Sequence, residues 1–249
     1  MTRQQFPKYV HSIVPDADAE HWPIQQQGVN ECGCTAPANA LNLLLGERRY
    51  DKDQFLREAG LFFQRKLGGS PSPITSWLIK RQGFGTHFGS LRKTNCEVVL
   101  RDLIDRRVPV VLELGAYKLG PLTLYGQHSV VLVGYSERYT DAGGQAHEEY
   151  YFVDAQYPDI DKPSTFGLHT NDADRDGDGV AEPYPGNRTI PRNLFLNDFP
   201  TGIYFPVFPN QAEHDRWYQE HIRPAAQIPI VSHFVAGMFT GSVDLWRAT

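Results

Sequence analysis

Residues 25–46 read QQQGVNECGCTAPANALNLLLG, and this stretch places two cysteines, Cys32 and Cys34, directly before an apolar helical pattern. The unpaired N–H groups and the dipole of a helix N-terminus lower the pKa of a nearby thiol, which makes the thiol a better nucleophile. Gln26 lies six residues before Cys32, and its amide is a candidate donor to the oxyanion of an acyl-transfer reaction. The stretch predicts a catalytic cysteine, with two small buried cysteines or a redox pair as the alternatives.

A cysteine nucleophile needs a base and a group that orients the base, and both can lie far away in sequence. His128 directly precedes the β-branched run SVVLVGY at 129–135, which predicts an imidazole held at the end of a core strand. Asp154 closes the next such run, YYFVD at 150–154. If these two strands are adjacent and antiparallel, the carboxylate of Asp154 lies beside the ring of His128.

The remaining pattern changes from helical to extended near residue 108. Apolar residues at helical spacing, with Ser72 as a cap, Pro73 at a first helical position and Gly83 past the end, predict helices early in the chain. These helices are expected over 39–45, 53–66 and 73–82, and after Asn95, whereas strands are expected over 108–114, 129–135, 148–154 and 202–208. Helices first and strands afterwards predict an α+β fold.

We interpret the 249 residues as one domain, 1–249, with a helical lobe over about 25–107 and a β lobe over about 108–209. A C-terminal helix and tail occupy 210–249. The net charge of −5 argues against nucleic acid as a partner. No signal sequence is visible in 1–15 and no membrane span in 224–243, so the expected location is cytoplasmic, or secreted if a leader was removed. The oligomeric state stays open.

The order of glutamine, cysteine, histidine and aspartate resembles that of the papain-like cysteine peptidases. The closest resemblance is to the bacteriocin leader-processing (double-glycine) peptidases and their stand-alone relatives, over residues 22–46 and 108–158. It rests on Gln26, Cys32, Gly33, Ala38, Leu41, Asn42, His128 and Asp154. The resemblance implies a papain-like fold, with the nucleophile helix of an N-terminal helical lobe packed on a C-terminal antiparallel sheet. It also implies Cys32 as nucleophile, His128 as general base, Asp154 as its orienter and Gln26 in the oxyanion hole.

Two features depart from that pattern. Pro37 lies inside the expected nucleophile helix, where proline removes a hydrogen bond. Either the helix begins near 33–35, which makes Cys34 the alternative nucleophile, or its first turn is distorted. The second departure is a polar insertion, DAGGQ at 141–145, between His128 and Asp154. A longer hairpin costs little and need not disturb the strand ends.

The predicted function is that of a cysteine-dependent hydrolase, a peptidase or amidase, acting on a peptide or amide-containing substrate through a thiolate acyl-enzyme. Two alternatives stay open. One is a peptidyl or acyl transferase, because the same order of residues is similar to that of phytochelatin synthases. The other, from a different class, is a catalytically silent calcium-binding scaffold with the same fold. No organic cofactor is expected.

A second constellation is the acidic stretch DADRDGDGVAE at 172–182. Oxygen ligands at alternate positions, with glycine for a tight turn, are typical of calcium loops. The candidate ligands are Asp172, Asp174, Asp176, Asp178, the carbonyl of Val180 and Glu182. Pro185 stands at the twelfth position, so the stretch is more similar to the short loops of dockerin-type and thrombospondin-type repeats than to an EF-hand. It predicts structural Ca²⁺, with a solvated acidic loop as the alternative.

Overall fold

The computed structural model describes residues 6–14, 24–65, 69–115, 117–119, 122–125, 128–141, 143–156, 169–170, 184–199, 201–223 and 242–246. Over these residues the chain forms six α-helices and a mostly antiparallel sheet, which confirms the expected α+β class. No helix within the described ranges is long and apolar enough to cross a bilayer.

The main sheet has ten strands among the described residues, in the order β10-β11-β9-β6-β3-β12-β2-β14-β13, with β1 paired to β6. All neighbours are antiparallel except β14 and β2, which are parallel. The strands are β1 (Val10–Ser12), β2 (Gly89–Leu91), β3 (Val110–Leu114), β6 (His128–Ser136), β9 (Glu149–Val153), β10 (His169–Thr170), β11 (Arg188–Pro191), β12 (Ile203–Pro206), β13 (Ile222–Arg223) and β14 (Ser242–Trp246). A separate pair is formed by β4 (Tyr117–Leu119) and β5 (Leu122–Tyr125).

Strand β6 lies in the middle of the sheet, and every residue of it is buried. This explains its continuous apolar sequence, since a strand covered on both faces has no polar alternation. β6 pairs with β3 on one side, where Leu114 lies opposite His128, and with β9 on the other, where Val153 lies opposite Val131. The start of β6 and the end of β9 therefore meet at one edge of the sheet.

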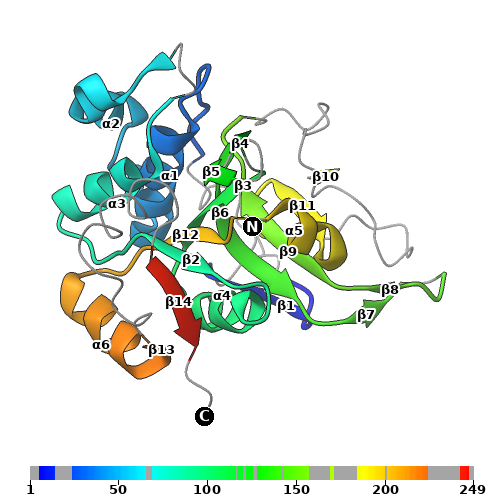
Figure 1. Cartoon of the computed structure of the whole chain (residues 1–249). Coiled ribbons are helices and arrows are strands. Elements are labelled where there is room, and N and C mark those ends of the chain that lie inside the picture. Colours follow the sequence, from blue (N-terminus) through cyan, green and yellow to red (C-terminus); the bar gives the residue numbers. More distant parts are fainter. Residues whose placement is uncertain are drawn as a thin grey trace.

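Three helices group at one end of the sheet in Figure 1: α1 (Cys32–Leu45), α2 (Lys52–Ala59) and α3 (Ser72–Arg81). Helix α1 packs on β6 and β3 and also contacts α2 and α3. The other helices are α4 (Cys96–Asp105), α5 (Arg192–Asp198) and α6 (Gln211–His221).

The helix expected over 53–66 is shorter than predicted. It ends at Ala59 and is followed by a 3₁₀ turn, Gly60–Phe62. Gly60 has φ of +53°, a positive value that ends the helix and favours glycine. Phe62, which a helix over 53–66 would place on the same face as the buried Phe55 and Ala59, is 62% exposed. The sheet also recruits β2 from within the expected helical lobe, and β1 from the segment before that lobe.

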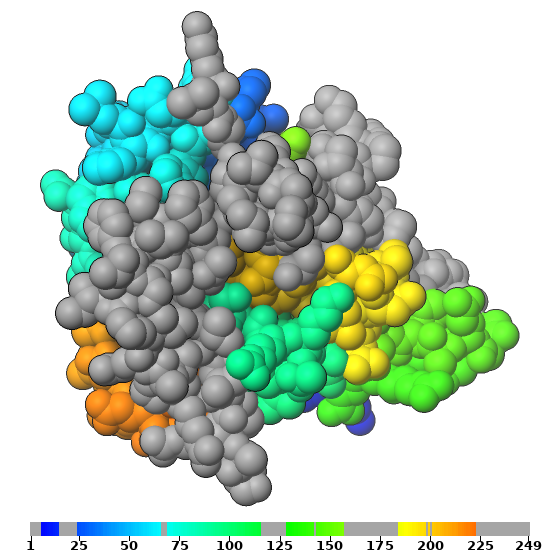
Figure 2. Space-filling model, in the orientation of Figure 1, coloured from blue at the N-terminus to red at the C-terminus, as the bar shows by residue number. Residues whose placement is uncertain are grey.

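A hairpin of β7 (Tyr139–Thr140) and β8 (Ala146–His147) contains the polar insertion. Figure 2 shows this hairpin projecting from one side of the molecule. It follows the last residue of β6 and precedes β9, at the opposite end of these strands from His128. The insertion therefore lies away from the edge where the two candidate residues meet.

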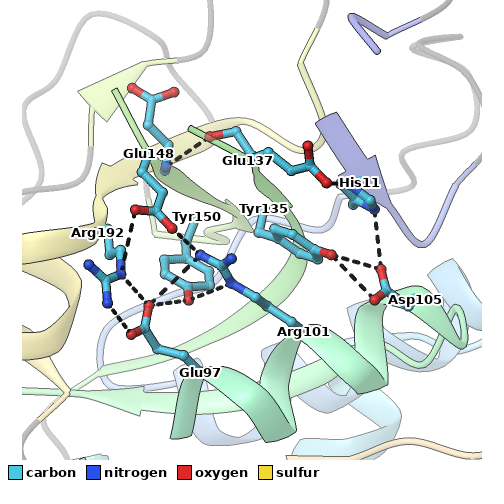
Figure 3. A network of polar contacts seen from close by, with 11 residues as sticks. His11, Glu97, Arg101, Asp105, Tyr135, Glu137, Glu148, Tyr150 and Arg192 are labelled. Carbon is cyan, nitrogen blue, oxygen red and sulfur yellow. Dashed lines mark hydrogen bonds and ion pairs between the residues drawn. The ribbon is translucent and has the colours of Figure 1, made fainter. Parts of the chain in front are cut away.

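Helix α4 is fastened to the sheet by a polar network (Figure 3). Glu97 accepts two hydrogen bonds of 2.6 Å from Arg192 and one of 2.8 Å from the hydroxyl of Tyr150. Burial opposes the charge of Glu97, but these bonds hold its pKa below the usual value. Arg101 adds an ion pair with Glu148 and lies 4.8 Å above the ring of Tyr135. These contacts join α4, β9, β6 and the start of α5.

Candidate active site

Cys32 is the first residue of α1, so the helix begins there and not at 33–35. Cys32 is partly exposed to solvent, whereas Cys34 is buried. Burial raises the pKa of the Cys34 thiol to about 12, which keeps it in the unreactive protonated form at neutral pH. Only Cys32, of these two cysteines, combines solvent access with the helix N-terminus.

The N-terminus of α1 receives no side-chain cap from Glu31, the residue before it. The Glu31 carboxylate is instead held by the backbone N–H of Gly28, by Lys52 at 2.9 Å and by Arg65. Burial opposes its charge, but these partners keep the pKa of Glu31 below the usual value. The first N–H groups of α1 thus receive no cap from the Glu31 side chain, which suits them to stabilise an anion.

Pro37 lies inside α1 without interrupting it. The carbonyl that loses its helical donor to Pro37 is that of Gly33, four residues earlier. The hydroxyl of Thr75, on α3, donates a hydrogen bond of 3.2 Å to this carbonyl. The interior proline is therefore compensated by a neighbouring helix, and α1 can start at Cys32 with a regular first turn.

His128 and Asp154 meet where β6 starts and β9 ends, as the strand pattern predicted. The Nε2 atom of His128 lies 2.8 Å from Oδ1 of Asp154. Both residues are buried, with exposed fractions of 3% for His128 and 0% for Asp154. Oδ1 of Asp154 also accepts a hydrogen bond of 2.9 Å from the backbone N–H of Gln156. The carboxylate is thus fixed against the imidazole in a buried site.

The imidazole of His128 also hydrogen-bonds the thiol of Cys32. Burial by itself lowers the pKa of His128, but the bonds and charges of Asp154 and Cys32 outweigh it and raise the pKa to about 10. Burial raises the pKa of Cys32, but His128 and the backbone N–H of Ser129 outweigh it and lower the pKa. Both directions favour a thiolate beside an imidazolium.

The segment before α1 is fixed on both sides of Gln26. The buried amide of Gln25 bonds the backbone of Tyr50 and Lys52, and the backbone N–H of Gln27 donates to the carbonyl of Ala155 at 3.0 Å. Gln26 itself is exposed. The structure thus brings Cys32, His128 and Asp154 together, whereas Gln26 is exposed.

Glu113 is a further member of the site that the motif reasoning missed. It lies on β3 opposite Ser129 and is 5% exposed. It accepts a hydrogen bond of 2.9 Å from the hydroxyl of Ser72, at the start of α3, and its charge acts to raise the pKa of Cys32. The signal in the sequence is a single carboxylate inside the apolar run VVLEL at 110–114, because buried charges are rare unless they have partners.

The acidic stretch 172–182, with Asp172, Asp174, Asp176, Asp178, Val180 and Glu182, lies outside the described residues. Within the described ranges no group of three or more potential metal ligands occurs. The calcium loop therefore stays a prediction from the sequence.

Neither the models of known protein families nor the curated proteins contain a match to this chain.

Proposed function

We propose that this protein is a cysteine-dependent acyl-transfer enzyme of the papain-like kind, acting as a peptidase or amidase. The observation that carries the proposal is the buried polar chain from Asp154 through His128 to Cys32, which ends at the N-terminus of a helix. A nucleophile, its base and the orienter of that base are the parts required for covalent catalysis by a thiol.

In the proposed reaction, His128 already holds the proton of the Cys32 thiol before the substrate binds, so the nucleophile is a thiolate. The sulfur then forms a bond to the carbonyl carbon of an amide, and the uncapped N–H groups of α1 receive the oxyanion. The C–N bond breaks, and the leaving amine takes its proton from the His128 imidazolium. Water, deprotonated by His128, attacks the thioester, and the S–C bond breaks to release a carboxylic acid and the free thiol. If an amine attacks in place of water, the product is a new amide and the enzyme is a transferase.

The Gln26 amide retains its predicted role as a second oxyanion donor in this proposal. Its neighbours on both sides are held by hydrogen bonds, so its backbone position is fixed, and an exposed side chain can reorient toward a bound substrate. Cys34 has no role in the chemistry, because a buried thiol of raised pKa is a poor nucleophile.

Acylation by p-nitrophenyl acetate tests the proposal. We expect a burst of nitrophenolate and one acetyl group, located on Cys32 by peptide mass spectrometry. Cys32→Ser and His128→Ala should each slow acylation at least about hundredfold, and Asp154→Asn at least about tenfold. Cys34→Ser is the matched control and should acylate at the wild-type rate.

Acetylation of Cys34, or none beyond the rate of a free thiol, would contradict the proposal. The second result would favour the catalytically silent scaffold. Adding a small amine to the acylated enzyme then separates the two chemistries, since a transferase yields the amide and a hydrolase yields acetate.

Calcium binding by 172–182 is proposed as a structural addition to this function. Five acidic residues held close together repel one another unless a cation joins them. Addition of EGTA should lower the melting temperature. If calcium was present at a hundred times its dissociation constant, its removal should lower the unfolding free energy by about 3 kcal/mol. An unchanged rate of Cys32 alkylation under EGTA would mark the cation as structural, and an unchanged melting temperature would contradict calcium binding.

A further inference from the structure

Asn187 attaches its side chain to the backbone of Asp154. Its Oδ1 accepts a hydrogen bond of 2.8 Å from the N–H of Asp154, and its Nδ2 donates one of 3.0 Å to the carbonyl of the same residue. One amide group thus satisfies both backbone groups of the residue that bonds His128. We propose that Asn187 is a positioning residue, which fixes Asp154 and through it the imidazole of His128.

The side chain of Asn187 continues the hydrogen bonding of the sheet by one residue, to Asp154. Strand β9 ends at Val153, and its pairing with β11 ends where Phe152 lies opposite Arg188. Asp154, beyond that pairing, is fully buried, so its backbone groups need partners in the protein. The amide of Asn187 has the same donor and acceptor as a peptide group, and it supplies both of them.

Asn187 reaches this position because the chain before it passes very close to β9. The backbone N–H of Asn187 donates to the carbonyl of Phe152 at 3.0 Å. Gly186 has φ of +72°, and a Cβ atom there would lie 2.2 Å from the same carbonyl. Only glycine fits such an approach, so Gly186 and Asn187 act as a pair.

The carboxylate of Asp154 depends on this support. Oδ1 is bonded by His128 and by the N–H of Gln156, whereas Oδ2 is buried and has no hydrogen-bond partner in the part of the chain that is described. Because only one oxygen of the carboxylate is bonded, no second bond would hold it in place if its backbone were displaced. Loss of the Asn187 amide would therefore weaken the bond between Asp154 and His128, lower the pKa of His128 and raise that of Cys32.

The test is the rate of Cys32 alkylation by iodoacetamide against pH in Asn187→Ala. Because one unit of thiol pKa changes the thiolate fraction about tenfold, we expect alkylation near about pH 6 to slow about tenfold, with little change where the thiol is fully ionised. The proton-linked titration of His128, followed by NMR, should move to lower pH. A merely structural role would leave both profiles in place.

Asn42→Ala is a matched control. Its amide makes the same two bonds to the backbone of one residue, Tyr50, each 2.8 Å long. This variant should lose stability and keep the wild-type pH profile. If it shifts the profile as far as Asn187→Ala does, or if Asn187→Ala leaves the profile unchanged, the positioning role is wrong.

Should Asn187→Ala not fold, Asn187→Ser replaces it. A serine hydroxyl is shorter and offers one oxygen in place of the separate donor and acceptor of the amide, and the same shift, smaller in size, is expected. The inference rests on the proposed function, but the two fail differently. A wild-type Cys32 without fast alkylation at low pH contradicts the proposed function, whereas a fast wild type with an unaltered Asn187 variant contradicts the role of Asn187 alone.

Discussion

At the scale of single residues, the site balances two opposing effects on one thiol. Burial and the charge of Glu113 favour the protonated Cys32, and His128 with the N–H of Ser129 favours the thiolate. The second pair prevails because Asp154 keeps His128 protonated. The charge of Glu113 raises the pKa of Cys32 and so disfavours the thiolate. Removing this charge should therefore make the thiol more acidic.

Glu113→Gln should therefore lower the pH at which Cys32 becomes reactive. The amide keeps a bond to Ser72 while the negative charge is lost. Iodoacetamide alkylation against pH measures the effect. Glu149→Gln is the control, since Glu149 is also a buried carboxylate on the sheet, bonded by Tyr139 and Tyr151 at the other end of β9. A Glu113→Gln profile equal to wild type would show that this charge does not act on Cys32.

At the scale of elements, the start of α1 depends on α3. Thr75→Val removes the donor to the Gly33 carbonyl and leaves that buried group unpaired, which should cost about 2 kcal/mol of unfolding free energy. Urea denaturation measures this loss.

The same substitution in a Pro37→Ala background is the informative comparison. Alanine restores the N–H that proline lacks, so the Gly33 carbonyl regains a helical donor. The cost of Thr75→Val should fall to about 1 kcal/mol or less in that background. Equal costs in the two backgrounds would mean that Thr75 stabilises the protein for another reason.

Helix α6 attaches to β12 and to the segment just before β2 through a histidine pair, His214 and His87. His214 is buried, and its Nε2 lies 2.8 Å from Nδ1 of His87, whose other nitrogen lies 2.8 Å from the hydroxyl of Tyr204. Burial and the neighbouring His87 lower the pKa of His214 to about 4. The folded protein thus resists a proton that the unfolded chain accepts near its ordinary pKa.

Because the pKa of His214 is lower in the folded protein than in the unfolded chain, protonation favours unfolding. Stability is lost as pH falls below the ordinary histidine pKa of about 6.5 and toward about 4, by about 2 kcal/mol between about pH 7 and about pH 5. His214→Gln should remove this part of the pH dependence, measured as unfolding free energy at both pH values. His147→Gln, in the projecting hairpin, should retain it. If His214→Gln loses as much stability in acid as the wild type, His214 is not the cause of this pH dependence.

For the whole molecule, two features could be predicted from the sequence. These are the α+β class and the contact between His128 and Asp154, which lie far apart in the chain. The buried runs of β3, β6 and β9 have no other place than the centre of a sheet, and antiparallel neighbours bring His128 to Asp154. The ends of the helices could not be predicted as well from the sequence. The end of α2 depends on the backbone conformation of Gly60, and the start of α1 depends on Thr75 from another helix.

The supporting residues of the site were missed for the same physical reason. Glu113 and Asn187 act through partners that are remote in sequence, and no spacing rule connects them to Cys32 or Asp154. Pro37 pointed to a displaced or distorted helix only because the compensating hydroxyl of Thr75 is invisible to a local pattern. Local rules thus gave the elements, while tertiary hydrogen bonds determined their ends and the supports of the site.

The most direct measurement of the central claim is the alkylation of Cys32 by iodoacetamide against pH, in the wild type and in His128→Ala, with the modified residue located by mass spectrometry. The account predicts fast alkylation of Cys32 well below the ordinary thiol pKa of about 8.5, and its loss in the variant. Alkylation of Cys32 at the rate of a free thiol in both proteins, or faster alkylation of Cys34, would contradict the account.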